Sequence, residues 1–235
     1  YGVAVSGYAA PLAFYELGDD GEVTDMADAV GLEVDGGCRS LLAVPHCTGA
    51  GDLFAGVERG PNRLFRNESG HYDLTDGGAL ADPTGDTRGA ALVDEDGTFA
   101  FAVGNEDGPN RLLRYTAAGG FEDVAPAALR EPGRVRTVVA ADFDNDGREE
   151  LFYNVLGEPN RLYERVGGDG SDDGANGSRW RPVDLGPAAE PDGFGTGAVA
   201  ADFDDDGALE LLVVHGEVAA QPTSVYEVAD AAAAG

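Results

Sequence analysis

Short apolar runs of strand length alternate with turn-forming residues along this chain, and no helical periodicity of any length competes with them. One stretch shows the pattern in full, with the runs VRTVVAADF (135–143), EELFYNV (149–155), NRLYERV (160–166) and RWRPVDL (179–185). Segments such as DNDG, LGEP and GGDG separate these runs. Apolar runs bounded by Gly, Pro, Asn and Asp in this way predict four consecutive β-strands.

The same order of runs recurs along the chain, and a proline motif marks each copy. The strong copies GPNRLFRN, GPNRLLRYT and EPNRLYERV and the weaker copies APLAFYEL and QPTSVYEV contain, respectively, Pro61, Pro109, Pro159, Pro11 and Pro222. Successive prolines are 48 or 50 residues apart, except in the last interval, which also holds a Gly/Ser/Asp-rich tract expected to be a surface loop. A repeat of this length with four strands in each copy is typical of a β-propeller.

We therefore predict an all-β protein, a single β-propeller domain over residues 1–235 built of four-stranded antiparallel blades. About five repeat units are expected, at approximately 1–37, 38–86, 87–134, 135–196 and 197–235. The first and last units are partial, because the first begins with a run that matches a second strand and the last shows no clear fourth strand. The small residues in the first run of each unit suit the narrow centre of a propeller.

Two acidic segments occupy the same place in their units, ADFDNDGREEL (141–151) and ADFDDDGALEL (201–211). Carboxylates crowded this closely repel one another, which is tolerable in a solvated turn without an ion or around a bound cation. The spacing D-x-D-x-D-G-x-x-E favours the cation, because it offers the six or more oxygen ligands that calcium takes. The predicted ligands are Asp142, Asp144, Asp146, the Arg148 carbonyl and Glu150, and in the second loop Asp202, Asp204, Asp206, the Ala208 carbonyl and Glu210.

Calcium suits this all-oxygen set better than zinc, and magnesium is a possible occupant with a stricter octahedral requirement. Each loop resembles the first half of an EF-hand loop but lacks the glutamate at position 12 and the flanking helices. We expect the ion to have a structural role between two strands of one blade. The segments 44–52 and 92–98 retain only part of the pattern, and we assign no ion to them.

The net charge of −29 is extreme, and arginine supplies all of the positive charge because no lysine occurs. A surface this negative argues against nucleic acid and anionic membranes as partners. It predicts adaptation to high salt, with a calcium-rich extracellular setting as the alternative. No run is long and apolar enough to span a bilayer, and the absence of a signal peptide and an initiator Met suggests a processed chain or a fragment.

Few residues suggest catalysis. The three histidines, His46, His71 and His215, fall in different units and share no motif. We predict that Cys38 and Cys47 are free thiols, because the expected strand between them would hold them too far apart for a disulfide.

Two further sets of residues recur at fixed places in the units. The recurring arginines are expected to make a repeated structural contact with a neighbouring acid, with an anion-binding ring as the alternative: Arg63, Arg111 and Arg161. The recurring aromatic residues are expected in the blade core: Tyr15, Phe65, Tyr163 and Tyr226.

The D-x-D-x-D-G loops followed by P-N-R-L resemble the FG-GAP/VCBS repeats, and most of all the cartilage-acidic-protein group. The resemblance covers nearly the whole chain. It implies a propeller with calcium on the loops between the first two strands of a blade. Such propellers are often seven-bladed, as in integrin α heads, so this chain would form about five blades of a seven-bladed ring. It also implies a secreted or cell-surface location.

The function expected from these observations is that of a non-catalytic, calcium-binding adhesion scaffold whose partner is a protein or a glycan. The alternative is a propeller-type polysaccharide lyase or hydrolase with structural calcium. In that case calcium and an arginine would neutralise a uronate substrate. A cleft in which Arg, His or Tyr side chains converge would favour the enzyme.

Overall fold

A computed structural model describes residues 2–7, 10–34, 36–45, 51–95, 97–166 and 179–228. These residues form five antiparallel sheets and two short 3-10 helices, η1 (Gly78–Ala81) and η2 (Gly186–Ala189). The predicted all-β class is confirmed. None of the helices in the described part of the chain is long and apolar enough to cross a membrane.

Each sheet is made of strands that follow one another in the chain and pair in that order. The three-stranded first sheet contains β1 (Gly2–Val5), β2 (Ala13–Leu17) and β3 (Val23–Asp25). The four-stranded second sheet contains β4 (Cys38–Val44), β5 (Asp52–Val57), β6 (Arg63–Glu68) and β7 (His71–Leu74), and the third contains β8 (Thr87–Glu95), β9 (Thr98–Asn105), β10 (Arg111–Thr116) and β11 (Gly120–Asp123).

The fourth sheet contains β12 (Val135–Ala141), β13 (Glu150–Val155), β14 (Arg161–Val166) and β15 (Arg179–Val183). The three-stranded fifth sheet contains β16 (Gly195–Ala201), β17 (Glu210–His215) and β18 (Ser224–Glu227). The four strands predicted from the apolar runs between 135 and 185 are therefore confirmed. Most of the tract predicted to form a surface loop, 167–178, lies outside the described residues.

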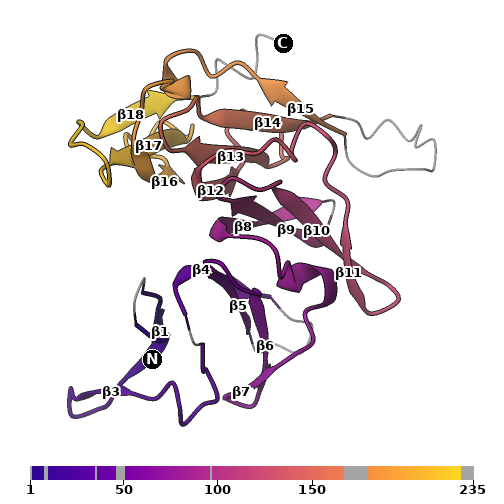
Figure 1. Cartoon of the computed structure of the whole chain (residues 1–235). Helices are drawn as coiled ribbons and strands as arrows, with labels where there is room; N and C mark the ends of the chain where they lie inside the picture. Colours follow the sequence, from indigo (N-terminus) through magenta and orange to yellow (C-terminus); the bar gives the residue numbers. More distant parts are fainter. Residues whose placement is uncertain are drawn as a thin grey trace.

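The sheets are arranged radially as propeller blades, and their first strands lie side by side (Figure 1). β4 contacts β8, β8 contacts β12, and β12 contacts β16. In Figure 1 the first sheet, in indigo, and the fifth, in yellow, lie at the two ends of an arc. Small residues allow the close approach of the first strands, since a Cβ added to Gly89 of β8 would lie 2.8 Å from the Cα of Thr137 in β12.

The hydrophobic core lies between neighbouring sheets. Phe54 of the second sheet and Phe101 of the third have ring centroids 5.3 Å apart, and Tyr153 and Tyr163 meet edge to face within the fourth sheet. The expected core positions Phe65 and Tyr163 are buried, and Tyr226 is half-buried. Tyr15 is 39% exposed, so the prediction that it belongs to the core is wrong. Tyr15 lies in the first sheet, at one end of the arc.

The asparagine of the P-N-R-L motif explains why the motif recurs. Its side-chain carbonyl accepts a hydrogen bond of 3.0 Å from the backbone at the end of the second strand, and its amide donates to a carbonyl of the segment leading to the next sheet. These residues are Asn62, Asn110 and Asn160. A buried amide with these partners holds each blade to the chain that enters the next blade.

A network of ion pairs crosses four sheets on the side where the first strands begin. Arginines from β4, β8 and β12 alternate with glutamates that follow the second strands. The order is Arg39, Glu58, Arg88, Glu106, Arg136 and Glu217. This network was not predicted from the sequence, although an arginine at the second position of three first strands is its sign in the sequence.

Cys38 is a buried free thiol, as predicted, and burial raises its pKa to about 11. Its expected companion Cys47, and the adjacent His46, lie outside the described residues.

Candidate metal centre

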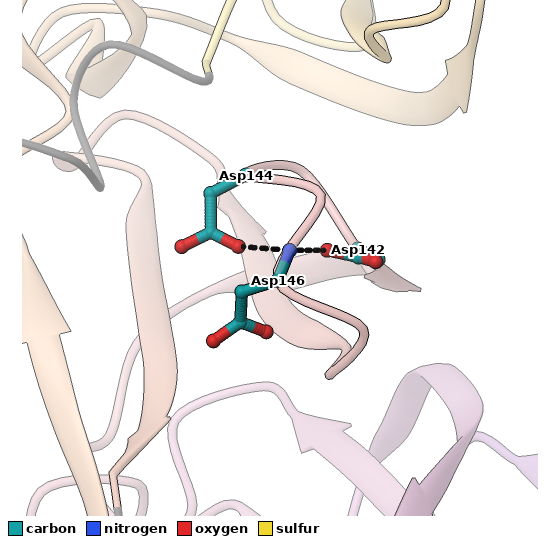
Figure 2. Close-up of side chains that lie close together, drawn as sticks. All are labelled: Asp142, Asp144 and Asp146. Carbon is teal, nitrogen blue, oxygen red and sulfur yellow. Dashed lines mark hydrogen bonds between the residues drawn. The ribbon is translucent and has the colours of Figure 1, made fainter.

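The first acidic loop leaves β12 at Ala141 and enters β13 at Glu150. The backbone N–H of Asp146 donates to the Oδ1 atoms of Asp142 and Asp144, each at 3.1 Å (Figure 2). The N–H of Gly147 donates to Oδ2 of Asp142 at 3.0 Å. These bonds curl the loop so that the alternating aspartates face a common point instead of alternating in direction as they would along a strand.

Two residues of each loop adopt left-handed backbone conformations. Asn145 has φ 57° and Gly147 has φ 87°, and in the second loop Asp205 has φ 62° and Gly207 has φ 92°. Glycine enters this region without steric cost, and Asn and Asp enter it more readily than other side chains. The sequence D-N-D-G or D-D-D-G is therefore suited to the sharp bend, as predicted for the glycine.

The second loop repeats the geometry of the first. The N–H of Asp206 donates to Oδ1 of Asp202 and Asp204 at 3.2 Å, and the N–H of Gly207 donates to Oδ2 of Asp202 at 3.0 Å. Each loop brings together three carboxylates whose nearest oxygens lie within 4.8 Å of one another. Oxygen donors at this separation are the chemistry that Ca²⁺ and Mg²⁺ prefer, so each group could hold a metal ion.

The two predicted glutamate ligands lie beside the aspartates and contact the loop backbone. Glu150 and Glu210 begin β13 and β17 and are 2% and 6% exposed. Their Oε2 atoms accept hydrogen bonds from the N–H groups of Phe143 and Phe203 at 2.8 and 2.7 Å. Each glutamate therefore ties its loop to the second strand, and its role as a ligand stays a prediction.

The residues predicted to offer a carbonyl also contact the third aspartate of each loop. The N–H groups of Arg148 and Ala208 donate to Oδ1 of Asp146 and Asp206, both at 2.8 Å. The Arg148 guanidinium forms an ion pair with Asp146, a contact that Ala208 cannot make. The two loops therefore differ in charge, because the first carries one internal cation.

The carboxylates of the first loop have perturbed pKa values. Burial, together with the nearby Asp146 and Asp142, raises the pKa of Asp144. Burial and the three aspartates raise the pKa of Glu150 to about 7. Asp146 differs, since the hydrogen bonds and charge of Arg148 outweigh its burial and lower its pKa. A divalent cation would reverse the repulsion that raises the first two pKa values.

Loops of three neighbouring sheets meet at this end of the blades. The Asn145 amide donates to the Gly207 carbonyl at 3.3 Å, which joins the two acidic loops. The Glu149 carboxylate accepts from the Asp94 N–H at 2.7 Å, which joins the first acidic loop to the turn of the third sheet. A change at one loop would therefore reach its neighbour through direct contacts.

The two segments with an incomplete pattern have other roles. In the third sheet the turn is tight, and Oδ1 of Asp94 accepts from the Gly97 N–H at 2.6 Å, while Asp96 lies outside the described residues. In the second sheet, Oδ1 of Asp52 accepts from the Asn67 N–H at 2.8 Å. Among the residues that the structure describes, the two acidic loops are the places where three or more His, Cys, Asp or Glu side chains lie close enough to hold a metal ion.

A second cluster of polar side chains, not predicted from the sequence, lies at the opposite end of the fifth sheet. Glu190 follows η2, and its carboxylate contacts Nε2 of His215 at 2.9 Å and the hydroxyl of Tyr226 at 2.6 Å. These residues come from three separate segments. No local sequence motif indicates this cluster, because its residues are brought together only in the folded blade.

The predicted contact of the recurring arginines with an acid is confirmed for Arg111 and Arg161. The Arg111 guanidinium bonds to the carboxylates of Asp82 and Asp123 at 3.2 and 3.1 Å. The Arg161 guanidinium contacts the carboxylates of Glu158 and Glu131 at 3.4 and 3.8 Å, and it donates to the backbone carbonyls of Glu131 and Pro132, both at 2.9 Å. Both arginines therefore bind the segment that enters their own sheet.

Comparison with known proteins agrees with the blades and the acidic loops. The FG-GAP-like repeat family matches residues 93–153, which include the first acidic loop and the strands on both sides of it. The chain is thus a β-propeller that contains an FG-GAP-like repeat.

Among curated proteins, the chain is similar to cartilage acidic protein 1 of several vertebrates. The chain is 41% identical over 189 residues to cartilage acidic protein 1 of Mus musculus, a match that covers 75% of this chain and 28% of the relative. It is 38% identical over 215 residues to the Homo sapiens protein and 36% identical over 217 residues to the Xenopus tropicalis protein, covering 86% and 87% of this chain. These matches span 32% and 33% of the relatives, so the chain corresponds to about a third of their length.

Proposed function

We propose that this chain is a non-catalytic binding scaffold, stabilised by calcium at its two acidic loops, that acts as a secreted or cell-surface adhesion protein. The observation that carries the proposal is the repetition of one geometry. Two loops in adjacent blades each gather three aspartate oxygens within 4.8 Å, with the same hydrogen bonds around them. Cartilage in the name of the relatives supports an extracellular location.

Calcium is the proposed ion, and magnesium is the competitor to be tested. The residues that would hold it are Asp142, Asp144 and Asp146 in one loop and Asp202, Asp204 and Asp206 in the other, with Glu150, Glu210 and the carbonyls of Arg148 and Ala208 completing the shells. When bound, the ion would neutralise carboxylates that otherwise repel one another. The proposed partner of the scaffold is a protein or a glycan.

Calcium titration by calorimetry, combined with thermal melting, tests this proposal. For a Kd of about 10⁻⁴–10⁻³ M, 10 mM calcium stabilises each site by about 1.4–2.7 kcal/mol. At about 2–4 °C per kcal/mol, this raises the melting temperature by about 3–11 °C for each site. Parallel titrations with magnesium separate the two ions.

The variants Asp144→Ala and Asp204→Ala should each remove one binding event and its share of the thermal shift. The matched control is Asp205→Asn, which removes one negative charge from the second loop at a position outside its group of three and keeps a residue that tolerates φ 62°. Retention of both binding events in a variant that carries Asp144→Ala and Asp204→Ala together would contradict the proposal. An unchanged melting temperature of the wild type, with no heat of binding, would contradict it as well.

The cluster around Glu190 favours the enzymatic alternative as a second candidate function. His215 and Tyr226 converge there, and both are side-chain types that can act as a general acid or base in a propeller-type polysaccharide lyase or hydrolase. Both side chains contact the same carboxylate, however, and a general acid or base must reach its substrate. Incubation with uronate-containing polysaccharides tests this candidate. Release of unsaturated or reducing ends that is lost in His215→Ala would support the enzyme over the scaffold.

A further inference from the structure

A pocket of about 330 Å³ adjoins the Glu190 cluster at the end of the fifth sheet, away from the acidic loops. We call it the Glu190 pocket, and it is lined by Glu190, Pro191, Asp192, Gly193, His215, Gln221, Pro222 and Ser224. The lining offers two carboxylates and no basic side chain other than the imidazole. Its size is that of a site for a small molecule or a single side chain.

The third sheet has an equivalent place, but there it is filled. Asp82 follows η1 as Glu190 follows η2, and both residues have left-handed backbones, with φ 34° and 42°. The Asp82 carboxylate accepts from the Asn105 amide at 3.1 Å and from the Arg111 guanidinium at 3.2 Å. Asn105 and His215 both end the second strand of their sheets, so the imidazole stands where the amide does.

The residue that differs most is the arginine of the proline motif. In the alignment of the repeats, G-P-N-R of the third unit corresponds to Q-P-T-S of the fifth, which places Ser224 where Arg111 stands. In the fourth unit Arg161 occupies this position and donates to two carbonyls of the preceding segment. The fifth unit thus keeps the acid but lacks the guanidinium, and the pocket lies at that place.

The acidic group at the centre of the pocket is a hydrogen-bond acceptor. Burial acts to raise the pKa of Glu190, but hydrogen bonds from Tyr226, His215 and Ser224 outweigh it and lower the pKa, so Glu190 is a carboxylate at neutral pH. Because a carboxylate only accepts, Nε2 of His215 is the donor in that contact. The His215 side chain is 4% exposed, and its Nδ1 is a buried atom without a hydrogen-bond partner among the described residues.

We propose that the Glu190 pocket binds the guanidinium group of an arginine side chain supplied by a partner protein, in place of the arginine that the third and fourth units supply internally. The planar guanidinium can donate to several acceptors at once, which suits a site lined by the carboxylates of Glu190 and Asp192, beside a His215 ring whose Nδ1 has no partner among the described residues. This proposal deepens the proposed scaffold function, on which it rests, by giving its partner a chemical class.

Binding of N-acetyl-L-arginine amide, measured by calorimetry and by NMR of the His215 ring nitrogens, tests the proposal. N-acetyl-L-citrulline amide, which has nearly the same shape and no charge, is the control ligand. Its affinity should be lower than that of the arginine amide by a factor of about ten or more. The full chain is used with calcium present and at fixed ionic strength, because the net charge of −29 attracts any cation.

Two variants examine the pocket from opposite directions. Ser224→Arg places the guanidinium inside the chain, as in the third unit, and should weaken binding of the arginine amide about tenfold or more, as should Glu190→Gln. Glu122→Gln removes an equal charge from the exposed surface of β11 and should leave the affinity within about twofold. The melting temperature of Ser224→Arg should equal or exceed that of the wild type. This result would show that the loss of binding comes from filling of the pocket and not from unfolding of the protein.

Equal binding of the arginine and citrulline amides, unchanged affinity in Ser224→Arg, or no shift at His215 would each overturn the proposal. A calcium-dependent shift of the melting temperature, measured on the same sample, distinguishes failure of the pocket proposal from failure of the proposed calcium-stabilised scaffold. If that shift is present and arginine does not bind, only the pocket proposal fails. If calcium has no effect and arginine binds at His215, the calcium part of the proposed function fails and the pocket stands.

Discussion

Replacing Arg88 with alanine tests whether the ion-pair network holds adjacent blades together. The Arg88 side chain is 8% exposed and contacts Oε1 of Glu58 at 3.0 Å, Oε2 of Glu106 at 2.5 Å and Oδ1 of Asp86 at 3.0 Å. Glu58 belongs to the second sheet and Arg88 to the third, so the contact crosses between blades. Removal leaves three acids together without the cation that lay among them.

The expected cost follows from what remains. Removing one partner of a buried ion pair costs about 3–5 kcal/mol. Here the lower end applies, because Glu58 keeps Arg39 at 2.7 Å and Glu106 keeps Arg136 at 3.3 Å. A loss of about 3 kcal/mol corresponds to a melting temperature lower by about 6–12 °C in a chain of this length.

Differential scanning calorimetry at physiological ionic strength measures the effect against a matched arginine. Arg134 also contacts Glu106, but at 3.7 Å, and its side chain is 40% exposed. Arg134→Ala should cost no more than about 1 kcal/mol. An equal fall in melting temperature for the two variants would show that burial between the blades adds nothing to the stability of the ion pair, which refutes this prediction.

Three further predictions concern packing, pH and salt. Gly89→Ala should cost about 1–3 kcal/mol in chemical denaturation, because its Cβ would lie 2.8 Å from the backbone of Thr137, and an unchanged midpoint would contradict the close packing of β8 and β12. The lowered pKa of Glu190 means that its carboxylate stabilises the fold above the ordinary value of 4.5 and loses this effect as the pH falls through the lower folded-state pKa; the gap in melting temperature between the wild type and Glu190→Gln should therefore narrow in acid. Sodium chloride should raise the melting temperature through screening of the net charge of −29, and a fall with salt would count against high-salt adaptation.

The sequence was sufficient for the blades because each strand is local. The apolar residues of the run NRLYERV and the turn-forming residues that follow it in the sequence predict a strand, and β14 forms at that place. The acidic loops were readable for the same reason, since three aspartates and a glycine within six residues determine the turn. Arg136 and Glu217 are 81 residues apart, and only the radial arrangement of the blades brings them to 2.8 Å. Contacts of this kind carry no local pattern.

The placement of positive charge connects the stability of this chain with its proposed binding. Arginine supplies every fixed cation, and the network through Arg88 and Arg136 neutralises acids between the blades. Where the repeat retains an acid but lacks that internal arginine, as at Ser224, a place remains that an external cation can fill. The acidic loops at the other end also gather carboxylates that a cation can neutralise, and there the proposed cation is a divalent ion and not a guanidinium. If this reasoning holds, Ser224→Arg should stabilise the fifth sheet without calcium, whereas Asp204→Ala should destabilise it only when calcium is present.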